Sequence, residues 1–276
     1  MSRMTPVTIV GAGAVGRSLA LALYRSGVTV AGVYSANGTS ARALARRVAA
    51  PSSGTLTGKI PFASVVILAV PDDAIPAAAV QVLRSAGAER IRTIIHCSGA
   101  LASLVLRPAA KRKISCASMH PLMTFPKKGR TVPMKDTWFA LEGDRTAVAL
   151  CRSLVKRMEG SSFTIDARKK TFYHMAAVFA SNYTVTLLEV AGQLAREAGV
   201  PAKDLWRIFG PLVTASVNNA LRHSPAAALT GPIARGDRAT VLRHLDALRG
   251  SKRMEHLLPV YAALGIEAAA LAGMER

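Results

Sequence analysis

The sequence predicts an α/β protein with an N-terminal doubly wound sheet and an all-helical C-terminal domain. In the first third of the chain, short apolar runs alternate with segments of helical spacing. This pattern is typical of a parallel sheet that helices cover on both faces. A turn rich in glycine follows the first apolar run. After Asp166 the strand signals stop, and helix signals continue to the end of the chain.

The elements of the first domain follow from these signals. The first helix ends at Gly27, because glycine is a common helix terminator, and Pro71 ends the third strand. A basic loop with prolines, Pro126–Lys135, separates two of the later strands. The predicted helices are Arg17–Ser26, Ser40–Ala49, with Ser40 as a candidate N-cap, and Ile75–Ala86. The predicted strands are Val7–Val10, Val28–Tyr34, Val65–Val70, Thr93–Cys97, Ser115–Met119, Thr137–Leu141 and Ser162–Ile165.

The second domain carries only helix signals. We expect the boundary near Asp166, which gives domains over residues 1–166 and 167–276. The predicted helices are Thr171–Ala198, Ala202–His223, Arg238–Leu248 and Glu255–Gly273, the last with a break.

Composition excludes several classes of protein. Three cysteines without CxxC spacing argue against a disulfide framework or a zinc site and favour a reducing, cytoplasmic location. No apolar run reaches the roughly 18 residues of a membrane span, so we expect no membrane partner. The net charge of +20 comes from scattered basic residues, and aromatics make up only 5% of the chain. Because a single-strand binder would interleave aromatic and basic residues, we expect no nucleic-acid partner. A polyanionic ligand remains an alternative meaning of the charge.

The glycine turn has the spacing G-x-G-x-x-G, at Gly11, Gly13 and Gly16, directly between a strand and a helix. In a Rossmann-type domain the first glycine permits a tight turn, the second lets a pyrophosphate approach the backbone, and the third lets helix and strand pack closely. The phosphates would lie at the helix N-terminus, beside Ala14 and Val15. The motif therefore predicts that residues 1–166 bind a dinucleotide, although a glycine turn without a ligand is an alternative.

The end of the second strand predicts which dinucleotide binds. NAD requires an acidic residue there for the ribose 2′-hydroxyl, but the first acidic residue of the chain is Asp72. Neutral and cationic donors suited to a 2′-phosphate are present instead, at Ser35, Asn37, Ser40 and Arg42. We therefore expect NADP (NADPH) as the cofactor. A solvated basic helix face is the alternative meaning of the arginines.

Two later strand ends complete the predicted cofactor site. In this fold the chain after the third strand passes over the cofactor, which places Ala69, Val70 and Pro71 against it. Ser98 follows the next strand, at the carboxyl edge of the sheet where ligands bind in open α/β sheets, so it is a candidate for both cofactor and substrate.

Four stretches carry a family resemblance: "HCSGAL", "ASMHPLMTFP", "YHMAAVFASNY" and "ALTGPIARGD". With the glycine turn, they resemble the oxidoreductases that join a Rossmann-like domain to a DUF2520 domain, within the superfamily of 6-phosphogluconate, β-hydroxyacid and ketopantoate dehydrogenases. The resemblance implies that residues 167–276 serve substrate binding and homodimerisation. The family typically has Ser-Arg after the second strand, whereas Ala36 follows Ser35 here, so Arg42 would have to substitute.

The first helix of the second domain carries the candidate catalytic residues. Related enzymes place a lysine and an asparagine four residues apart against the nicotinamide, whereas this chain has Lys170 and His174. At about 100° per residue these two lie roughly 40° apart on one face, and Asn182 lies at its edge. A lysine or histidine could supply the proton that an alkoxide needs after hydride transfer, and Lys170 could stabilise the oxyanion. A hydrogen-bonded core histidine and a solvated lysine are the alternative reading.

Two further residues are candidates for substrate binding. His120 follows a strand and could face the same cleft, and Arg235 could clamp a carboxylate from a turn between helices. No residues show metal-ligand spacing, so no metal is expected. Together these features predict an NADP-dependent reductase of a small carbonyl acid, with ketopantoate as the most specific candidate, from kinship alone. The competing hypothesis is a non-catalytic NADP-binding sensor or scaffold, which would keep its cellular role when Lys170 and His174 are both changed to Ala.

Overall fold

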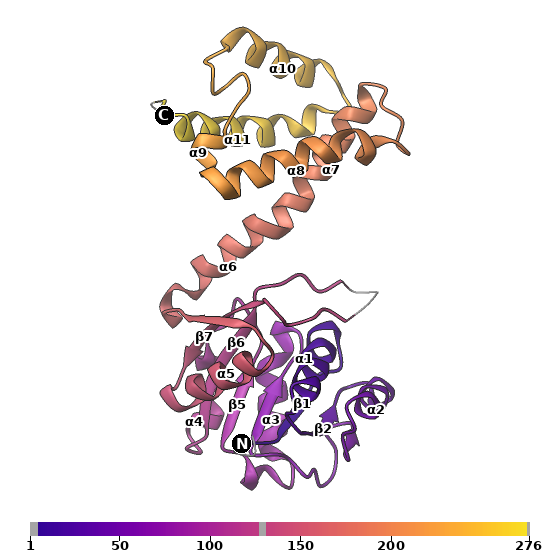
Figure 1. The fold of residues 1–276 in the computed structure, drawn as a ribbon, viewed down its shortest axis with the longest axis vertical. Helices are drawn as coiled ribbons and strands as arrows, with labels where there is room; N and C mark the ends of the chain where they lie inside the picture. Colours follow the sequence, from indigo (N-terminus) through magenta and orange to yellow (C-terminus); the bar gives the residue numbers. More distant parts are fainter. Residues whose placement is uncertain (1–4, 127–130, 275–276) are drawn as a thin grey trace. The chain divides into compact units, whose positions relative to one another are not determined.

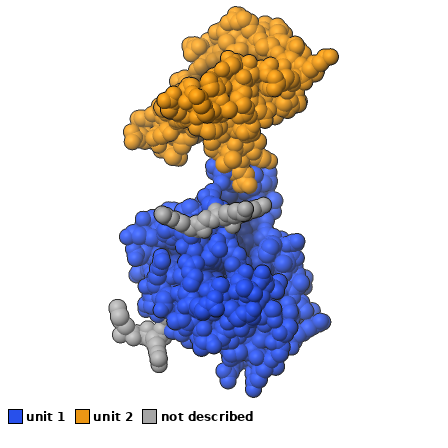
Figure 2. Space-filling view, turned by 90° about the vertical axis from the view of Figure 1, so that its right-hand side faces the viewer, with its two compact units in different colours: residues 1–181 blue, residues 182–276 orange. Residues whose placement is uncertain are grey.

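The computed structural model describes residues 5–126 and 131–274, and the chain divides into two compact units, residues 1–181 and 182–276 (Figure 2). The predicted loop Pro126–Lys135 is described only at its two ends, since residues 127–130 lie outside the described ranges. Asp166 follows the last strand of the sheet. As a boundary between domains it stays a prediction.

Unit 1 contains an eight-stranded sheet in the order β3-β2-β1-β4-β5-β6-β7-β8. Figure 1 labels several of these strands, among them β1 and β5. The pairs from β3 to β6 are all parallel, whereas β7 runs antiparallel to β6 and parallel to β8. All seven predicted strands are present within a few residues of their expected ends, and the two-residue β3 was not predicted. The strands are β1 Val7–Val10, β2 Val30–Tyr34, β3 Ser53–Gly54, β4 Val65–Leu68, β5 Thr93–His96, β6 Ser115–Pro121, β7 Trp138–Gly143 and β8 Ser161–Thr164.

Helices cover both faces of this sheet, which confirms the doubly wound architecture. On one face, Val7 and Ile9 of β1 pack with side chains of α1 (Ala14–Arg25), α2 (Gly38–Arg47) and α5 (Arg145–Arg157). On the other face, Val66 and Leu68 of β4 pack with α3 (Ile75–Arg84) and α4 (Arg107–Ala110). Successive side chains of a strand point to opposite faces, so a strand buried on both sides is apolar throughout. Short 3₁₀ turns lie at Asp72–Ala74, Ala88–Arg90, Ser103–Leu106 and Ala167–Lys169.

Two local predictions differ from the structure. The N-cap of α2 is Asn37, not Ser40, because the Asn37 side chain accepts hydrogen bonds from the backbone N–H groups of Thr39 and Ser40. Helix α5 was not predicted. Its buried residues recur at helical spacing, but arginines and a lysine between them dilute the apolar signal.

Unit 2 is helical throughout its described residues. Before it, α6 (Lys170–Val178) is followed by a π-helical stretch, Phe179–Tyr183, which contains the division between the units. The helices of unit 2 are α7 (Thr184–Glu197), α8 (Leu205–His223), α9 (Pro225–Ala228), α10 (Arg238–Gly250) and α11 (Leu258–Leu271), with a 3₁₀ turn at Glu255–Leu257. The last predicted helix, Glu255–Gly273, thus consists of this 3₁₀ turn followed by the uninterrupted α11. Within the described residues, no helix is long and apolar enough to span a membrane.

Candidate functional site

The glycine turn lies at the carboxyl end of β1, where α1 begins. Gly11 has a φ of +111°, and a Cβ there would collide with the Ala69 carbonyl oxygen. A Cβ on Gly16 would collide with the Gly11 carbonyl oxygen. By contrast, a Cβ on Gly13 would meet nothing within 4 Å. Gly11 and Gly16 thus shape the turn, while the backbone at Gly13 faces open space that a ligand could enter.

The first turn of α1 offers unpaired backbone donors beside this space. The helix begins after Gly13 without a side-chain cap and has no acidic residue in its first turn. A helix leaves its first four N–H groups without a partner inside the helix, and Ala14 and Val15 carry two of them. Together with the positive end of the helix dipole, these groups favour an anion.

A second set of donors lies at the start of α2, directly after β2. The Arg42 guanidinium donates a hydrogen bond to the Thr39 hydroxyl at 3.2 Å and lies over Gly38, where a Cβ would be 3.3 Å from Nη1. The hydroxyls of Ser35 and Ser40 have no hydrogen-bond partner among the described residues. The predicted cofactor residues Ser35, Asn37, Ser40 and Arg42 therefore lie together in one short segment, with no carboxylate among them.

The chain after β4 lies against the glycine turn. Ala69 is buried and its N–H donates to the Val10 carbonyl at 2.7 Å, whereas Val70 is half-buried and Pro71 exposed. The close approach of Ala69 to Gly11 places this segment beside the turn, as expected. Contact of Ala69, Val70 and Pro71 with a cofactor stays a prediction.

Lys170 lies at the centre of a buried polar network in unit 1. Its side chain is 2% exposed, and Nζ lies 3.2 Å from Glu142 Oε1 and donates to the Ser118 hydroxyl. Glu142 also accepts from the Ser103 N–H at 2.6 Å and from the Ser103 hydroxyl at 2.7 Å. Burial lowers the pKa of Lys170, and the carboxylate of Glu142 opposes that shift. Lys170 is therefore a core residue rather than a solvated one.

The same network reaches the carboxyl end of β5. The Ser118 hydroxyl donates to the Ser98 carbonyl at 3.1 Å. The Ser98 hydroxyl accepts from the N–H groups of Ala100 and Leu101 at 3.1 and 2.9 Å, which shapes the turn after the strand. Ser98 is buried, so its observed role is to hold this turn, and its contact with cofactor or substrate stays a prediction.

Two histidine rings lie against the backbone of Gly99 in this turn. A Cβ on Gly99 would be 2.8 Å from His120 Nε2 and 2.9 Å from His174 Cδ2. His120 Nδ1 is hydrogen-bonded to the Tyr173 hydroxyl at 2.7 Å. The structure thus brings together His120 from the end of β6, His174 from α6 and the turn after β5. We call His120, Tyr173 and His174 the histidine cluster.

Burial keeps His96 and His120 neutral at pH 7. Burial, followed by the positive charge of Lys170 and by His174, lowers the pKa of His120 to about 4. Burial and then Lys170 lower the pKa of His96, whose Nδ1 accepts from the Ser98 N–H, to about 3. Burial raises the pKa of Tyr173 to about 12. His120 and Tyr173 therefore offer neutral donors and acceptors beside the buried Lys170.

Two predicted site residues belong to unit 2 and are described within that unit alone. Asn182 is its first residue, and its carbonyl accepts from the Thr186 hydroxyl at 3.1 Å. Arg235 is exposed in the turn before α10, where its N–H donates to the Gly231 carbonyl at 3.3 Å. The roles of Asn182 in catalysis and of Arg235 in substrate binding stay predictions.

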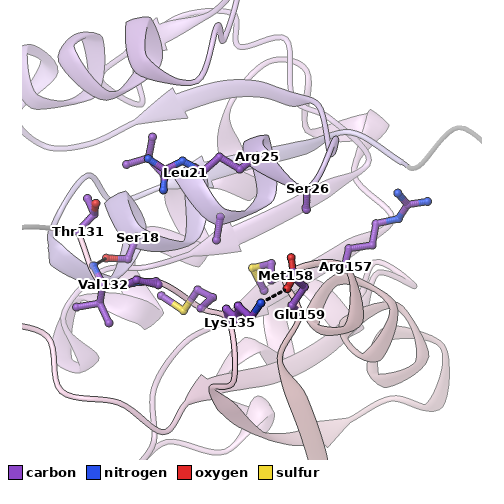
Figure 3. Close-up of a pocket in the computed structure, with 13 residues that line it drawn as sticks. Ser18, Leu21, Arg25, Ser26, Thr131, Val132, Lys135, Arg157, Met158 and Glu159 are labelled. Atoms are coloured by element: carbon purple, nitrogen blue, oxygen red, sulfur yellow. Dashed lines mark hydrogen bonds and ion pairs between the residues drawn. The ribbon is translucent and has the colours of Figure 1, made fainter.

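A separate cavity of about 180 Å³ lies between α1, residues 131–135 and the end of α5 (Figure 3). Two pairs of polar groups lie in its wall: Lys135 and Glu159 form an ion pair at 3.0 Å, and the Ser18 hydroxyl accepts from the Val132 N–H at 3.0 Å. It extends along α1 to Arg25 and Ser26, at the end of the helix far from the glycine turn. None of the predicted site residues lines it.

Sequence reasoning missed Glu142, Ser118, Ser103, Tyr173 and Thr39. Tyr173 adjoins His174 in a motif that was singled out, so its proximity was available as a signal. Glu142 is 28 residues from Lys170 and 39 from Ser103, and nothing in the sequence indicates that they meet. Among the described residues, no group of three or more metal-ligand side chains is present.

Two family models match the chain: a Rossmann-like domain over residues 2–121, and DUF2520, a domain of unknown function, over residues 137–268. The chain thus joins a Rossmann-like domain to a DUF2520 domain. Most of the β strands and the glycine turn lie in the first match, whereas Glu142 and the whole of α6 lie in the DUF2520 match. No curated protein matches the sequence.

Solved structures similar to this DUF2520 protein cover nearly the whole chain. A provisionally named NADP oxidoreductase from Bacteroides fragilis is 24% identical, with a TM-score of 0.77, and the match covers 97% of this chain and 99% of that one. Protein TM1727 from Thermotoga maritima is 26% identical, with a TM-score of 0.75 and coverage of 97% and 98%. A reductive aminase from Aspergillus terreus, in complex with NADPH and ethyl-5-oxohexanoate, is 17% identical, with a TM-score of 0.65 and coverage of 97% and 98%. These similarities show a shared fold.

Proposed function

We propose that the protein is an NADP-dependent oxidoreductase that reduces a C=O or C=N group of a small molecule. The arrangement at the ends of β1 and β2 carries this proposal. Gly13 leaves room for a pyrophosphate, and the start of α2 offers Arg42 and free hydroxyls without any carboxylate. These residues fit a dinucleotide with a 2′-phosphate. The solved structures named for NADP or bound to NADPH support the same cofactor.

The polar groups of unit 1 suit the chemistry of reduction. NADPH, when bound, supplies a hydride, and the carbonyl oxygen that accepts the charge then needs stabilisation and a proton. We assign the stabilising charge to Lys170, whose ammonium lies beneath the turn that carries Gly99, and proton transfer to a residue of the histidine cluster, with His174 as the candidate from the sequence. Asn182 as a catalytic residue and Arg235 as a substrate-binding residue stay the candidates that the sequence gives for unit 2.

The substrate class has two candidates. Kinship with ketopantoate enzymes favours a 2-keto acid, for which Arg235 would bind the carboxylate. Similarity to a reductive aminase favours a C=N bond, because reductive amination passes through an imine. Lys170 carries a positive charge, and His96 and His120 are neutral, so these groups suit a neutral or anionic substrate.

We further propose that the protein is a homodimer formed through unit 2. The buried apolar core of this unit is small and centres on Leu248, Met254 and Leu257. Large apolar side chains are exposed instead, among them Leu221 at 81%, Val185 at 66% and Leu212 at 63%. Contiguous exposed apolar surface typically marks an interface, and most oligomers pair identical subunits. A monomer of 29.0 kDa in sedimentation would contradict this proposal.

One experiment tests the activity. The purified protein is loaded with NADPH and mixed with a panel of 2-keto acids including ketopantoate, with the same acids plus ammonia or a primary amine, and with cyclic imines. Loss of NADPH absorbance with keto acids alone would identify a carbonyl reductase. Loss that requires the amine or the imine would identify a C=N reductase. Tight NADPH binding with no turnover would favour the non-catalytic sensor instead.

A further inference from the structure

We infer that His120 is the proton donor of the proposed reduction, through its Nε2–H group, and that Tyr173 selects this tautomer and lends its phenol proton to Nδ1 while Nε2 is deprotonated. The inference rests on the proposed function and assigns a specific role within it. It differs from the expectation drawn from the sequence, in which Lys170 or His174 supplies the proton and His120 only binds substrate.

The hydrogen bond between His120 and Tyr173 determines where the ring proton lies. One of the two groups must donate across the 2.7 Å between Nδ1 and the phenol oxygen. A phenol is far more acidic than the N–H of a neutral imidazole, and an imidazole nitrogen is the better acceptor, so Tyr173 donates. Nδ1 of the neutral ring then carries no proton, and Nε2 carries the only one.

The Nε2 atom of His120 lies at the edge of the sheet where ligands bind in open α/β sheets. Nε2 and Cε1 of His120 lie against Gly99, at the carboxyl edge of the sheet, with the His174 ring next to them. His120 is only half-buried, and Nε2 has no hydrogen-bond partner among the described residues. A donor held at this edge and left unpaired is available to a carbonyl oxygen or an imine nitrogen.

Aromatic packing fixes the orientation of the pair. Tyr173 lies edge-on to His120, with ring centroids 5.7 Å apart, and edge-on to Phe163 at 6.0 Å. Phe163 packs in turn on Trp138. Such contacts restrict the rings to one arrangement, so the donor is oriented before substrate binds.

Lys170 is less suited to the proton step than His120. Its Nζ is buried and already donates to Ser118 and Glu142, so it contributes its charge rather than a proton. A neutral imidazole can donate a hydrogen bond to a substrate carbonyl and polarise it. The neutral histidine of triosephosphate isomerase, whose pKa is lowered, acts in this way. The lowered pKa of His120 agrees with that role.

One proton passes from His120 to the substrate, and another passes from Tyr173 to His120. As the hydride forms a C–H bond, the electrons of the C=O or neutral C=N bond move onto the heteroatom, which takes the proton from His120 Nε2. Nδ1 takes the phenol proton of Tyr173, so the imidazole stays neutral and a phenolate forms. When product leaves, water reprotonates Nε2 and the proton on Nδ1 returns to Tyr173. The cycle consumes one hydride from NADPH and one proton from solvent.

The test combines two variants with a matched control. His120→Ala removes the donor, and Tyr173→Phe removes only the hydroxyl while keeping the ring that packs on Phe163. Unit 2 contains the same kind of pair, since His244 Nδ1 is hydrogen-bonded to the Tyr261 hydroxyl at 2.7 Å with ring centroids 5.7 Å apart. Tyr261→Phe therefore removes an equivalent bond outside the histidine cluster.

We expect His120→Ala to lower kcat by about 10²- to 10⁴-fold, the usual contribution of a general acid, and Tyr173→Phe by about 10-fold or more. NADPH binding and the activity of Tyr261→Phe should not change. In the wild-type protein, ¹⁵N NMR should show His120 as the Nε2–H tautomer at pH 7, and Tyr173→Phe should mix the two tautomers.

The possible failures are distinguishable. If His120→Ala and Tyr173→Phe each turn over at the wild-type rate, this inference is wrong, while the proposed function is unaffected. An Nδ1–H tautomer of His120 would overturn it as well, independently of any turnover. No NADPH consumption by the wild-type protein with any carbonyl or imine would overturn the proposed function, and with it any catalytic role of His120.

Discussion

Lys170 and Glu142 form a buried ion pair, with Nζ 3.2 Å from Oε1 and both side chains 2% exposed. Two charges are taken out of water here, which is stabilising only when hydrogen bonds satisfy them. The Lys170 ammonium also donates a hydrogen bond to the Ser118 hydroxyl. The Glu142 carboxylate accepts hydrogen bonds from the N–H and the hydroxyl of Ser103. The pair thus joins β7 to α6 and holds the cation beneath the turn after β5.

We expect Glu142→Gln to lower the free energy of unfolding by about 3–5 kcal/mol, because it leaves the Lys170 charge buried without a counter-ion. The double change Glu142→Gln with Lys170→Met should cost less than the sum of the two single changes. Urea unfolding of the four proteins in the cycle measures this coupling.

The exposed pair Lys135–Glu159 provides the control for that cycle. Its atoms are 3.0 Å apart, but the side chains are 65% and 67% exposed. Lys135→Met should cost at most about 1 kcal/mol, as exposed ion pairs usually do. Equal losses at Lys170 and Lys135, or additive effects in the cycle, would show that the buried pair is not coupled.

Substitutions of two glycines in the turn should have different effects, one on NADPH binding and the other on the stability of the fold. Gly13→Ala adds a methyl group to open space, so the free protein should remain as stable as wild type while NADPH binding weakens strongly. Gly11→Ala places a side chain at φ +111° against the Ala69 carbonyl and should destabilise the fold itself. Thermal unfolding without ligand, together with NADPH titration, checks both. Unchanged NADPH affinity in Gly13→Ala would place the pyrophosphate elsewhere.

Stability should fall as pH drops from about 6.5 toward 4. His96 and His120 have folded pKa values of about 3 and about 4, below the ordinary value of 6.5. In this window the unfolded chain binds protons that the folded protein does not, so each histidine lowers the free energy of unfolding by roughly 1.4 kcal/mol per pH unit as pH falls.

The change His120→Gln should remove one of these two contributions and make the slope of unfolding free energy against pH shallower by that amount. Denaturant unfolding at several pH values between 4.5 and 6 measures this slope. The control is His223→Gln, at an exposed position, which should give the same slope as the wild-type protein. An unaltered slope in His120→Gln would mean that His120 titrates normally in the folded protein.

The sequence predicted the fold well because its signals are local. Apolar strands, helical spacing and the glycine turn each depend on neighbours in the chain, and α5 was missed where charged residues diluted that pattern. The site was predicted less completely. The alternative interpretation of Lys170, a solvated lysine like the exposed Arg168 and Lys169 beside it, is wrong, because Lys170 is buried.

The partners of Lys170 depend on topology rather than on local pattern. Glu142 reaches it because β7 pairs antiparallel with β6, opposite Ser118. No spacing rule connects a residue of β7 to the first residue of α6. The same applies to His120 and Tyr173, which are 53 residues apart and meet only when β6 and α6 are in place.

Cofactor choice should depend on Arg42. Its guanidinium is held by Thr39 over Gly38, the first residue of α2, in the same short segment as Ser35 and Ser40. A charge-assisted hydrogen bond contributes about 1.5–3 kcal/mol, so one contact to a 2′-phosphate should favour NADP over NAD by roughly tenfold to a hundredfold. Arg42→Ala should remove most of this preference by weakening NADP binding, with NAD binding nearly unchanged.

Thr39→Val should give a smaller loss, because it frees the guanidinium without removing it. Arg46, exposed one turn further along α2, provides the matched control, and Arg46→Ala should keep the preference. Calorimetric titration of each protein with NADP and NAD measures both affinities. If wild-type protein binds the two cofactors equally, or binds NAD more tightly, the 2′-phosphate is not held at the start of α2. If Arg46→Ala loses as much preference as Arg42→Ala, the effect comes from the general positive charge of the helix and not from a contact that Arg42 makes.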